Sequence, residues 1–481
     1  MLRACFIAVF AFAAAAALLT AGPLNPPAGA VSSTQKTLSD VEPRIAINAA
    51  NTPGDAGTLF RITQPGSYYL TGNINGVSGK AGIFVASADV TIDLNGFAMV
   101  GVAGASQGIV APSNLQRISV RNGKVRAWPF TAVSLGPDAM VEDLQVGANL
   151  STDAIVCGDR SIVRSCAVQA AASAFYVGSG SLVLDCVATG VGNGVSCPTA
   201  ATDVRVEGCR LLGANAGTGL NLGGRSTAKD CTLSGFPIGC TSGAGSTVES
   251  VTIAGGSLGL FAGADCVISG VTVTGAGSTG ITAGDNSRIS RSAVRQCSQG
   301  FEIGSDCVLS ECVATAIGFT GFVSQSRNTF IDCSSSANTG GGGFSGVDSN
   351  SYTNCRADVN AGDGFTGRFG SVWENCSARS NNGDGVETSS GGTVRNGRFD
   401  GNGNGASVGA NIRVTGDVCR IEGNSLIGAD FGIQATSGGN VIVRNSSRNS
   451  ANSYGGIVGG NDVGPIGSAA TGTSPWGNVQ Y

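Results

Sequence analysis

The chain has 481 residues, a formal net charge of −4 and a charged fraction of only 12%, and it contains no histidine. The absence of histidine excludes a Ser-His-Asp triad, a histidine general base and histidine-ligated metal sites. A net negative charge gives the chain no electrostatic affinity for nucleic acid. Glycine occupies 77 positions, but 42% of the residues are hydrophobic, which favours a packed core over disorder.

Residues 1–30 have the features of a secretory signal peptide. Arg3 provides the charged start, residues 6–19 form an apolar run too short to cross a membrane, and residues 28–30 (AGA) offer a small-residue cleavage site. No later apolar run approaches the ~18 residues that a membrane span needs. We therefore expect a mature protein without a membrane span that is secreted, periplasmic or exposed at the cell surface.

Residues 81–446 contain an internal repeat. Two examples are SLVLDCVATG at 181–190 and RNTFIDCSSS at 327–336, in which a short apolar run, a polar residue and a second short run follow one another. We call the polar residue or glycine before the second run the marker. It recurs every 20 to 23 residues, with one step of 27, at Asn122, Asp143, Ser165, Asp185, Gly208, Asp230, Ser250, Gly270, Arg291, Glu311, Asp332, Asn354, Asn375, Asn396, Gly423 and Asn445. A sustained period of this length is typical of a solenoid.

The local pattern predicts strands. Asn, Asp and Gly dominate the marker, and these residues tolerate a positive φ. Apolar residues alternate with polar ones beside it, as at Ile92 and Leu94, which predicts a short strand on each side of the bend. About ten residues later, a small residue followed by a β-branched or aromatic residue predicts a third strand. The sequence therefore predicts an all-β fold, a right-handed parallel β-helix (solenoid) of about 17 coils stacked ~4.8 Å apart.

Other solenoids fit the sequence less well. Leucine-rich repeats need recurring Leu, which is sparse here, and a left-handed β-helix needs a hexapeptide repeat that the chain lacks. Calcium-binding nonapeptides are approached once, at 340–348. The segments 31–80 and 447–481 lack the repeat and carry three and two prolines. Because the ends of a stack expose unpaired backbone, we predict an N-terminal cap at 31–80 and a C-terminal cap or tail at 447–481.

The segment PGSYYLTGNINGVSGKAGIFVASADVTIDLNGF at 65–97, together with the coils that follow, carries a family resemblance. It resembles secreted bacterial right-handed parallel β-helix proteins of the pectin-lyase-like superfamily, over about residues 45–465. The resemblance is specific for the fold. Members include pectate lyases, polygalacturonases, alginate lyases and epimerases, phage tailspikes and adhesins. The resemblance therefore implies an interaction with carbohydrate but does not assign a reaction. The lack of histidine departs from the polygalacturonases and the alginate epimerases.

Fifteen of the sixteen cysteines remain after the predicted signal peptide. Eight share one position of the repeat, in two runs that each span four successive coils: Cys166, Cys186, Cys209, Cys231, Cys312, Cys333, Cys355 and Cys376. This position has the apolar parity of the strand, so we expect inward-facing free thiols that act as small hydrophobic side chains. Disulfides remain an alternative, above all among the cysteines outside this position. A zinc site is disfavoured because no CxxC pair exists.

Asp363 and Asp384 are the first candidates for chemistry. They occur in GDG motifs 21 residues apart, so we expect them to stack on adjacent coils, where two close carboxylates could bind Ca²⁺. With a nearby base such as Arg368, the resemblance to pectate lyases would make them catalytic residues of a Ca²⁺-dependent lyase. The alternative is a tight turn in which each Asp bonds to its own backbone. No other cofactor is evident.

A basic segment is the second candidate. Arg121, Lys124, Arg126 and Trp128 lie close together in RNGKVRAWPF, and cations beside an aromatic ring could bind an acidic sugar. The alternative is an exposed basic edge with Trp128 packed beneath a loop. A third set consists of acidic markers, Asp143, Asp185, Asp230, Glu311 and Asp332, which would form a row of carboxylates. Bend geometry explains this row as well, because Gly, Ser and Asn occupy the same position in other coils.

The sequence predicts the fold more sharply than the function. The leading hypothesis, which rests on the resemblance, is a secreted β-helix that interacts with an extracellular polysaccharide, with no assigned catalytic residue and with enzyme activity left open. The second is a non-enzymatic structural or cell-surface rod that contacts other components of the cell envelope. The third is the Ca²⁺-dependent polysaccharide lyase.

Overall fold

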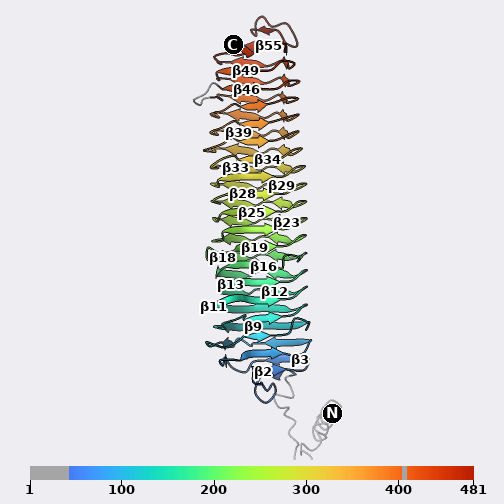
Figure 1. The fold of residues 1–481 in the computed structure, drawn as a ribbon, viewed down its shortest axis with the longest axis vertical. Helices are drawn as coiled ribbons and strands as arrows, with labels where there is room; N and C mark the ends of the chain where they lie inside the picture. The colour runs from blue at the N-terminus through green and yellow to red at the C-terminus, as the bar shows by residue number, and fades with distance from the viewer. Residues whose placement is uncertain (1–42, 404–408) are drawn as a thin grey trace, which may run out of the picture. The chain divides into compact units, whose positions relative to one another are not determined.

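The computed structural model describes residues 43–403 and 409–481 (Figure 1). The chain divides into two compact units, Met1–Ile45 and Ala46–Tyr481, and the stacked coils belong to the second. The predicted signal peptide at 1–30 lies outside the described residues. All regular structure in the described part is strand, and this part has no helix long and apolar enough to cross a membrane.

Each coil contributes one strand in turn to three parallel sheets. The first sheet contains β2 (Thr58–Ile62), β5 (Ala81–Val85), β8 (Ile109–Val110), β10 (Val133–Leu135), β16 (Asn193–Ser196), β19 (Thr218–Leu222), β22 (Ile238–Ser242), β25 (Leu258–Ala262), β28 (Thr279–Ala283), β31 (Gln299–Ile303), β34 (Phe322–Ser324), β37 (Phe344–Gly346), β40 (Phe365–Gly367), β43 (Val386–Thr388), β46 (Ala410–Val414), β49 (Phe431–Ala435) and β52 (Gly456–Ile457).

The second sheet follows the first along the chain. It contains β3 (Gly66–Tyr69), β6 (Val90–Asp93), β12 (Ile162–Arg164), β14 (Leu182–Leu184), β17 (Arg205–Glu207), β20 (Thr227–Lys229), β23 (Thr247–Glu249), β26 (Val267–Ser269), β29 (Arg288–Ser290), β32 (Val308–Ser310), β35 (Thr329–Ile331), β38 (Ser351–Thr353), β41 (Val372–Glu374), β44 (Thr393–Arg395), β47 (Arg420–Glu422), β50 (Val441–Val443) and β53 (Asp462–Val463).

The third sheet completes the coil. It contains β4 (Ile74–Asn75), β7 (Ala98–Val100), β15 (Val187–Val191), β18 (Arg210–Gly213), β21 (Thr232–Ser234), β24 (Thr252–Ala254), β27 (Thr272–Thr274), β30 (Ala293–Arg295), β33 (Val313–Thr315), β36 (Ser334–Ser336), β39 (Arg356–Asp358), β42 (Ser377–Arg379), β45 (Arg398–Asp400), β48 (Ser425–Ile427) and β51 (Ser446–Arg448). Three longer strands bend from one sheet into the next: β9 (Ile118–Arg126), β11 (Met140–Cys157) and β13 (Ala167–Val177). In the chain, β1 (Ile45–Ala46) precedes these strands, and β54 (Ile466–Gly467) and β55 (Asn478–Gln480) come after them.

The predicted parallel β-helix is confirmed, with about 20 coils instead of about 17. The register is regular, so that Phe322 pairs with Phe344 and Phe344 pairs with Phe365. Parallel pairing already begins where β2 meets β5 and continues to the pairing of β50 with β53. Equivalent side chains of successive coils therefore stack in rows along the fold.

The bend between the second and third sheets has the backbone that the markers predict. At the fifteen markers from Asn122 to Gly423, φ lies between 47° and 71°. The last prediction is wrong by one residue, since Arg444 (φ 60°) makes the bend instead of Asn445. Asn445 takes the inward position after the bend, and its Oδ1 accepts the N–H of Asn424 in the preceding coil at 3.0 Å.

The cysteines that follow the markers point into the core. All fifteen cysteines of the described part are buried free thiols, with no disulfide among them. In one example, Cys186 Sγ donates to the carbonyl oxygen of Leu184 at 3.2 Å. The free-thiol prediction therefore holds for this part of the chain.

Aromatic side chains stack in the core of the C-terminal half. Rings of the first sheet lie 4.6 to 4.8 Å apart in one row, Phe301, Phe322, Phe344 and Phe365. A second row on the second sheet, Phe330, Tyr352 and Trp373, meets the first edge-on. Offset and edge-to-face contacts of this kind add to the free energy gained by burial.

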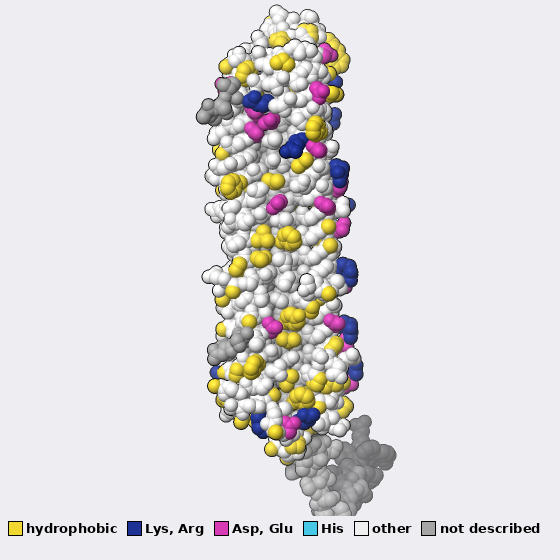
Figure 2. Space-filling model, in the orientation of Figure 1, with side chains coloured by type: hydrophobic (Ala, Val, Ile, Leu, Met, Phe, Trp, Pro, Cys, Tyr) yellow, Lys and Arg dark blue, Asp and Glu magenta, His cyan; other side chains and the backbone are white. Residues whose placement is uncertain are grey.

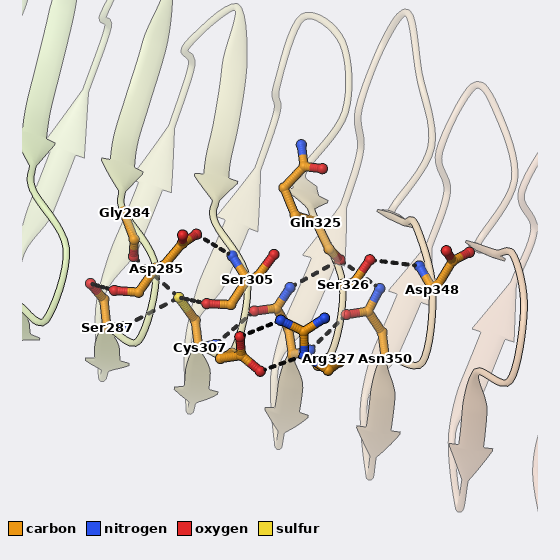
Figure 3. Close-up of polar contacts among 12 residues, drawn as sticks. Gly284, Asp285, Ser287, Ser305, Cys307, Gln325, Ser326, Arg327, Asp348 and Asn350 are labelled. Atoms are coloured by element: carbon orange, nitrogen blue, oxygen red, sulfur yellow. Dashed lines mark hydrogen bonds and ion pairs between the residues drawn. The ribbon is translucent and has the colours of Figure 1, made fainter.

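A buried polar row satisfies the backbone at the bend between the first and second sheets (Figure 3). The N–H of Ser287 donates to Cys307 Sγ at 3.3 Å, and the N–H of Cys307 donates to Asn328 Oδ1 at 2.8 Å. The N–H of Asn328 in turn donates to Asn350 Oδ1 at 2.8 Å. Each coil thus supplies the acceptor for the preceding coil, so the bend does not leave buried N–H groups unpaired.

Charged pairs lie outside the same bend. Asp306 and Arg327, on adjacent coils, are joined by Nε–Oδ1 and Nη2–Oδ2 contacts of 2.7 and 2.6 Å. Equivalent bidentate pairs are Asp89–Arg117, Asp138–Arg160 and Asp203–Arg225. Figure 2 shows charged side chains concentrated along one edge of the stack, beside a broad face that is mostly uncharged.

Candidate functional site

Asp363 and Asp384 lie at the bends that lead into β40 and β43 of the first sheet. The N–H of Asp384 donates to Asp363 Oδ1 at 2.6 Å, and the N–H of Ala410 donates to Asp384 Oδ1 at 2.6 Å. The two carboxylates therefore stack on adjacent coils. Each accepts from the following coil, which differs from a turn in which Asp bonds to its own backbone.

Glu387 brings a third carboxylate to this site. It lies three residues after Asp384, on the outer face of β43, and one oxygen of each of the three side chains lies within 4.8 Å of the others. Thr366 occupies the position equivalent to Glu387 on the preceding coil, which is also the coil of Asp363. Its Oγ1 donates to Asp363 Oδ2 at 3.3 Å. We call Asp363, Asp384 and Glu387 the acidic cluster.

Arg413 is the cation of the acidic cluster. It pairs with Glu387 in the register of β43 and β46, and both its Nε and its Nη2 donate to the carboxylate of Asp384. Its Nη1 donates to Gln434 on the next strand. One guanidinium beside three carboxylates leaves the fully ionised site with a charge of −2, so protons or a cation would be bound here preferentially.

Burial and mutual repulsion shape the titration of the acidic cluster. Burial raises the pKa of Asp363, and the negative charge of Asp384 adds to this effect. Burial raises the pKa of Glu387 as well, followed by the charges of Asp363 and Asp384. The hydrogen bonds from Arg413 to Asp384 raise the pKa of the guanidinium. The site thus combines two carboxyl groups that hold protons more tightly with one carboxylate that is ion-paired, which is the arrangement that general acid–base chemistry uses.

Arg368 is placed elsewhere. It follows β40 and is exposed at the turn toward β41. Sequence reasoning missed Glu387 and Arg413. The outward parity of β43 could have revealed Glu387, because the strand places it three residues after Asp384. Arg413 could not be identified from the sequence, because the 27-residue step of the repeat leaves open which residue of the next coil pairs with Glu387.

The basic segment lies on another sheet. Arg121 pairs with Asp93 at 3.4 Å, whereas Lys124 and Arg126 line a cleft of about 470 Å³ with Gln145 and Gln169. Trp128 is fully buried, and its Nε1–H donates to the carbonyl oxygen of Met99 at 3.3 Å. The structure therefore keeps two cations at a surface cleft of the third sheet and removes the aromatic ring from that surface.

The acidic markers occupy left-handed bends. Asp143, Asp185, Asp230, Glu311 and Asp332 have φ values of 50° to 54°. Within the described part of the chain, the acidic cluster is the one place where three carboxylate or thiol side chains bring potential metal-ligand atoms within 4.8 Å of one another. The markers are therefore accounted for by backbone geometry, and the acidic cluster remains as the candidate site.

Comparison with known proteins gives structural similarities only. No family model matches the chain, and no curated protein matches it. The A-module of a mannuronan C-5 epimerase from Azotobacter vinelandii is 12% identical, covers 82% of this chain and 90% of its own, and has a TM-score of 0.24. A periplasmic alginate epimerase is 11% identical, with coverage of 75% and 82% and a TM-score of 0.29. The catalytic domain of a GH87 alpha-1,3-glucanase is 10% identical, with coverage of 66% and 63% and a TM-score of 0.30. Similarities this distant assign no activity to this chain.

Proposed function

We propose that the protein acts outside the cytoplasm on an extracellular polysaccharide, and that the acidic cluster performs acid–base chemistry on this polymer. The observation that carries the proposal is the cluster itself, in which Asp363, Asp384 and Glu387 converge within 4.8 Å beside Arg413. The predicted signal peptide at 1–30 and the sequence resemblance to carbohydrate-active β-helices support the location and the class of ligand. A polymer suits a face on which equivalent positions repeat about every 4.8 Å.

Each side chain of the site has a role in this proposal. Glu387 lies on the outer face of β43 with a raised pKa, so it can donate a proton to a leaving oxygen. Asp384 forms an ion pair with Arg413, and a carboxylate next to the polymer can stabilise positive charge that develops on a sugar ring. Asp363 adds a third carboxyl group whose raised pKa follows from its burial.

A Ca²⁺-dependent lyase is the second candidate, because the three carboxylates offer the hard oxygen donors that Ca²⁺ prefers. Asp363, Asp384 and Glu387 would hold the ion, and a bound Ca²⁺ would neutralise an acidic sugar. Arg413 competes for Asp384, and backbone N–H groups already occupy one oxygen each of Asp363 and Asp384. These contacts favour chemistry by the carboxyl groups alone over chemistry at a bound cation.

The experiment is a panel of neutral and acidic polysaccharides incubated with the purified mature protein, with and without Ca²⁺. Reducing ends and the absorbance of unsaturated uronates are followed together. New reducing ends without absorbance are the expected result, and absorbance that requires Ca²⁺ would establish the lyase instead. A protein that neither cleaves nor binds any polymer would overturn the proposal and leave a structural component of the cell envelope.

A further inference from the structure

The first sheet carries a polar cleft on its outer face, four coils before Asp384 and Glu387 of the acidic cluster. The cleft has a volume of about 490 Å³ and is lined by Ser278, Ser298, Gln299, Glu302 and Phe319, with backbone between them. Glu302 is the one charged residue of this lining. An exposed aromatic ring beside amide and hydroxyl groups is a common composition for sites that bind a hydroxyl-rich ligand with an apolar face.

The register places this cleft in line with the acidic cluster. Along the outer face, equivalent positions run through Phe261, Thr282, Glu302, Val323, Ser345, Thr366, Glu387 and Arg413. Gln299 precedes Glu302 by three residues, as Asp384 precedes Glu387, so the pair 299/302 repeats the position of the pair 384/387. Four coil steps of ~4.8 Å separate the two pairs by about 19 Å.

The surface between the two pairs is low. Three coils lie between the pairs, and their equivalent positions hold Thr320 and Val323, Gly342 and Ser345, and Asp363 and Thr366. Phe319 lies on the first of these three coils, and 59% of its surface is exposed. An extended chain can therefore lie along the coils from Phe319 to the acidic cluster without displacing a large side chain.

The charge of this strip selects among polymers. Glu302, Asp363, Asp384 and Glu387 oppose Arg413 alone, so four carboxylates and one guanidinium sum to −3 when all are ionised. An acidic polymer would be repelled where it passes Glu302 and the acidic cluster, whereas a neutral one exposes hydroxyl groups that Gln299 and Glu302 can bind.

We infer that a neutral polysaccharide lies along the first sheet, parallel to the stack, with a sugar ring against Phe319 and the reacting bond at the acidic cluster. This inference rests on the proposed function and adds to it the class of polymer, its direction and a binding position at Phe319, three coil steps or about 14 Å from the coil of Asp384 and Glu387. The cleft beside Lys124 and Arg126 lies on the third sheet and takes no part.

The test is affinity electrophoresis of the mature protein in gels that contain a neutral polymer (dextran, laminarin, galactomannan or xyloglucan) or an acidic one (polygalacturonate or alginate). At least one neutral polymer should retard the wild-type protein. Phe319→Ala should weaken this binding about tenfold, the equivalent of about 1.4 kcal/mol. Phe369→Ala is the matched control, because Phe369 is equally exposed (58%) at a turn outside this strip, and its binding should equal that of the wild type.

The outcomes separate this inference from the proposed function. Cleavage of acidic polymers only, or equal binding by Phe319→Ala and Phe369→Ala, would overturn the inference and leave the acidic cluster as the reactive site. Retardation by acidic polymers that disappears in Lys124→Ala/Arg126→Ala would also overturn it, since the third sheet would then be the binding face. Asp384→Asn should lose cleavage while keeping the retardation, because the proposed binding position does not include Asp384.

Discussion

Arg413 donates through both Nε and Nη2 to the carboxylate of Asp384, which lies 29 residues earlier in the chain. Asp384 is almost fully buried, so removing the guanidinium would leave a buried carboxylate without its counterion. We expect Arg413→Ala to lower the free energy of unfolding by about 1–3 kcal/mol, less than for a fully buried pair because Arg413 remains partly exposed. Chemical denaturation measures this change. Arg368→Ala, at an exposed turn, should stay within about 0.5 kcal/mol of the wild type, and an equal loss in both variants would contradict the assignment.

The raised pKa of Asp363 predicts a pH-dependent stability. The folded protein keeps a proton on this carboxyl at pH values where the unfolded chain, with a pKa of about 3.9, has released it. The stability from this proton is present below the unfolded pKa and is lost as the pH rises through the folded pKa. Asp363→Asn removes this pH-dependent loss of stability. The free energy of unfolding of the variant minus that of the wild type should therefore rise from about pH 4 toward neutral pH.

Asp306→Asn provides the opposite slope for comparison. The hydrogen bonds from Arg327 lower the pKa of Asp306, so its contribution is present above the unfolded pKa and is lost as the pH falls through the folded pKa. The difference in free energy of unfolding between Asp306→Asn and the wild type should therefore become smaller as the pH falls. Parallel, flat pH profiles for Asp363→Asn and Asp306→Asn, measured by urea unfolding, would contradict both assignments.

The marker Asn375 tests the backbone of the repeat. Its φ of 54° is costly for a β-branched residue and free of strain for glycine. We expect Asn375→Val to lower the free energy of unfolding by about 1–3 kcal/mol. Asn375→Gly should remain within about 1 kcal/mol of the wild type. Equal denaturation midpoints for the two variants would show that the left-handed bend is not required at this coil.

The buried thiols should resist modification in the folded protein. Burial raises the pKa of Cys157 and of Cys240 to about 12, which keeps their reactive thiolate forms rare at neutral pH. We expect the native mature protein to react with a thiol reagent only after unfolding in denaturant, when fifteen thiols become available. Rapid reaction under native conditions, or fewer than fifteen thiols after unfolding without reductant, would contradict this arrangement.

The fold was predictable because it repeats. Each coil repeats the same pattern of apolar residues on both sides of a bend residue, so the bend at Asp332 or Asn375 could be recognised by its position in the series. Asn445 is the exception. It is a residue type common at the markers, but its side chain takes the inward position and Arg444 makes the bend. Composition identifies residues that tolerate a left-handed bend, but only the register decides which of two neighbours occupies it.

The candidate site was predictable only where its members obey the period. Asp363 and Asp384 are 21 residues apart and stack as their spacing suggests. Glu387 contacts them from the strand that follows the same bend, so its place depends on strand parity. Arg413 follows the 27-residue step between the markers Asn396 and Gly423, whose extra residues break the period, so its partner could not be deduced by counting. A cation nearer in sequence, Arg368, lies instead at an exposed turn.

The most direct test of the account compares wild-type protein with Asp384→Asn on the polysaccharide that the wild type cleaves. The asparagine keeps an acceptor for the N–H of Ala410 but removes the negative charge that forms the ion pair with Arg413. In Asp384→Asn the rate of release of reducing ends should fall at least about 100-fold, while retardation in the polysaccharide gel stays close to that of the wild type and shows that the variant is folded. Undiminished release by Asp384→Asn would show that the acidic cluster does not carry the chemistry.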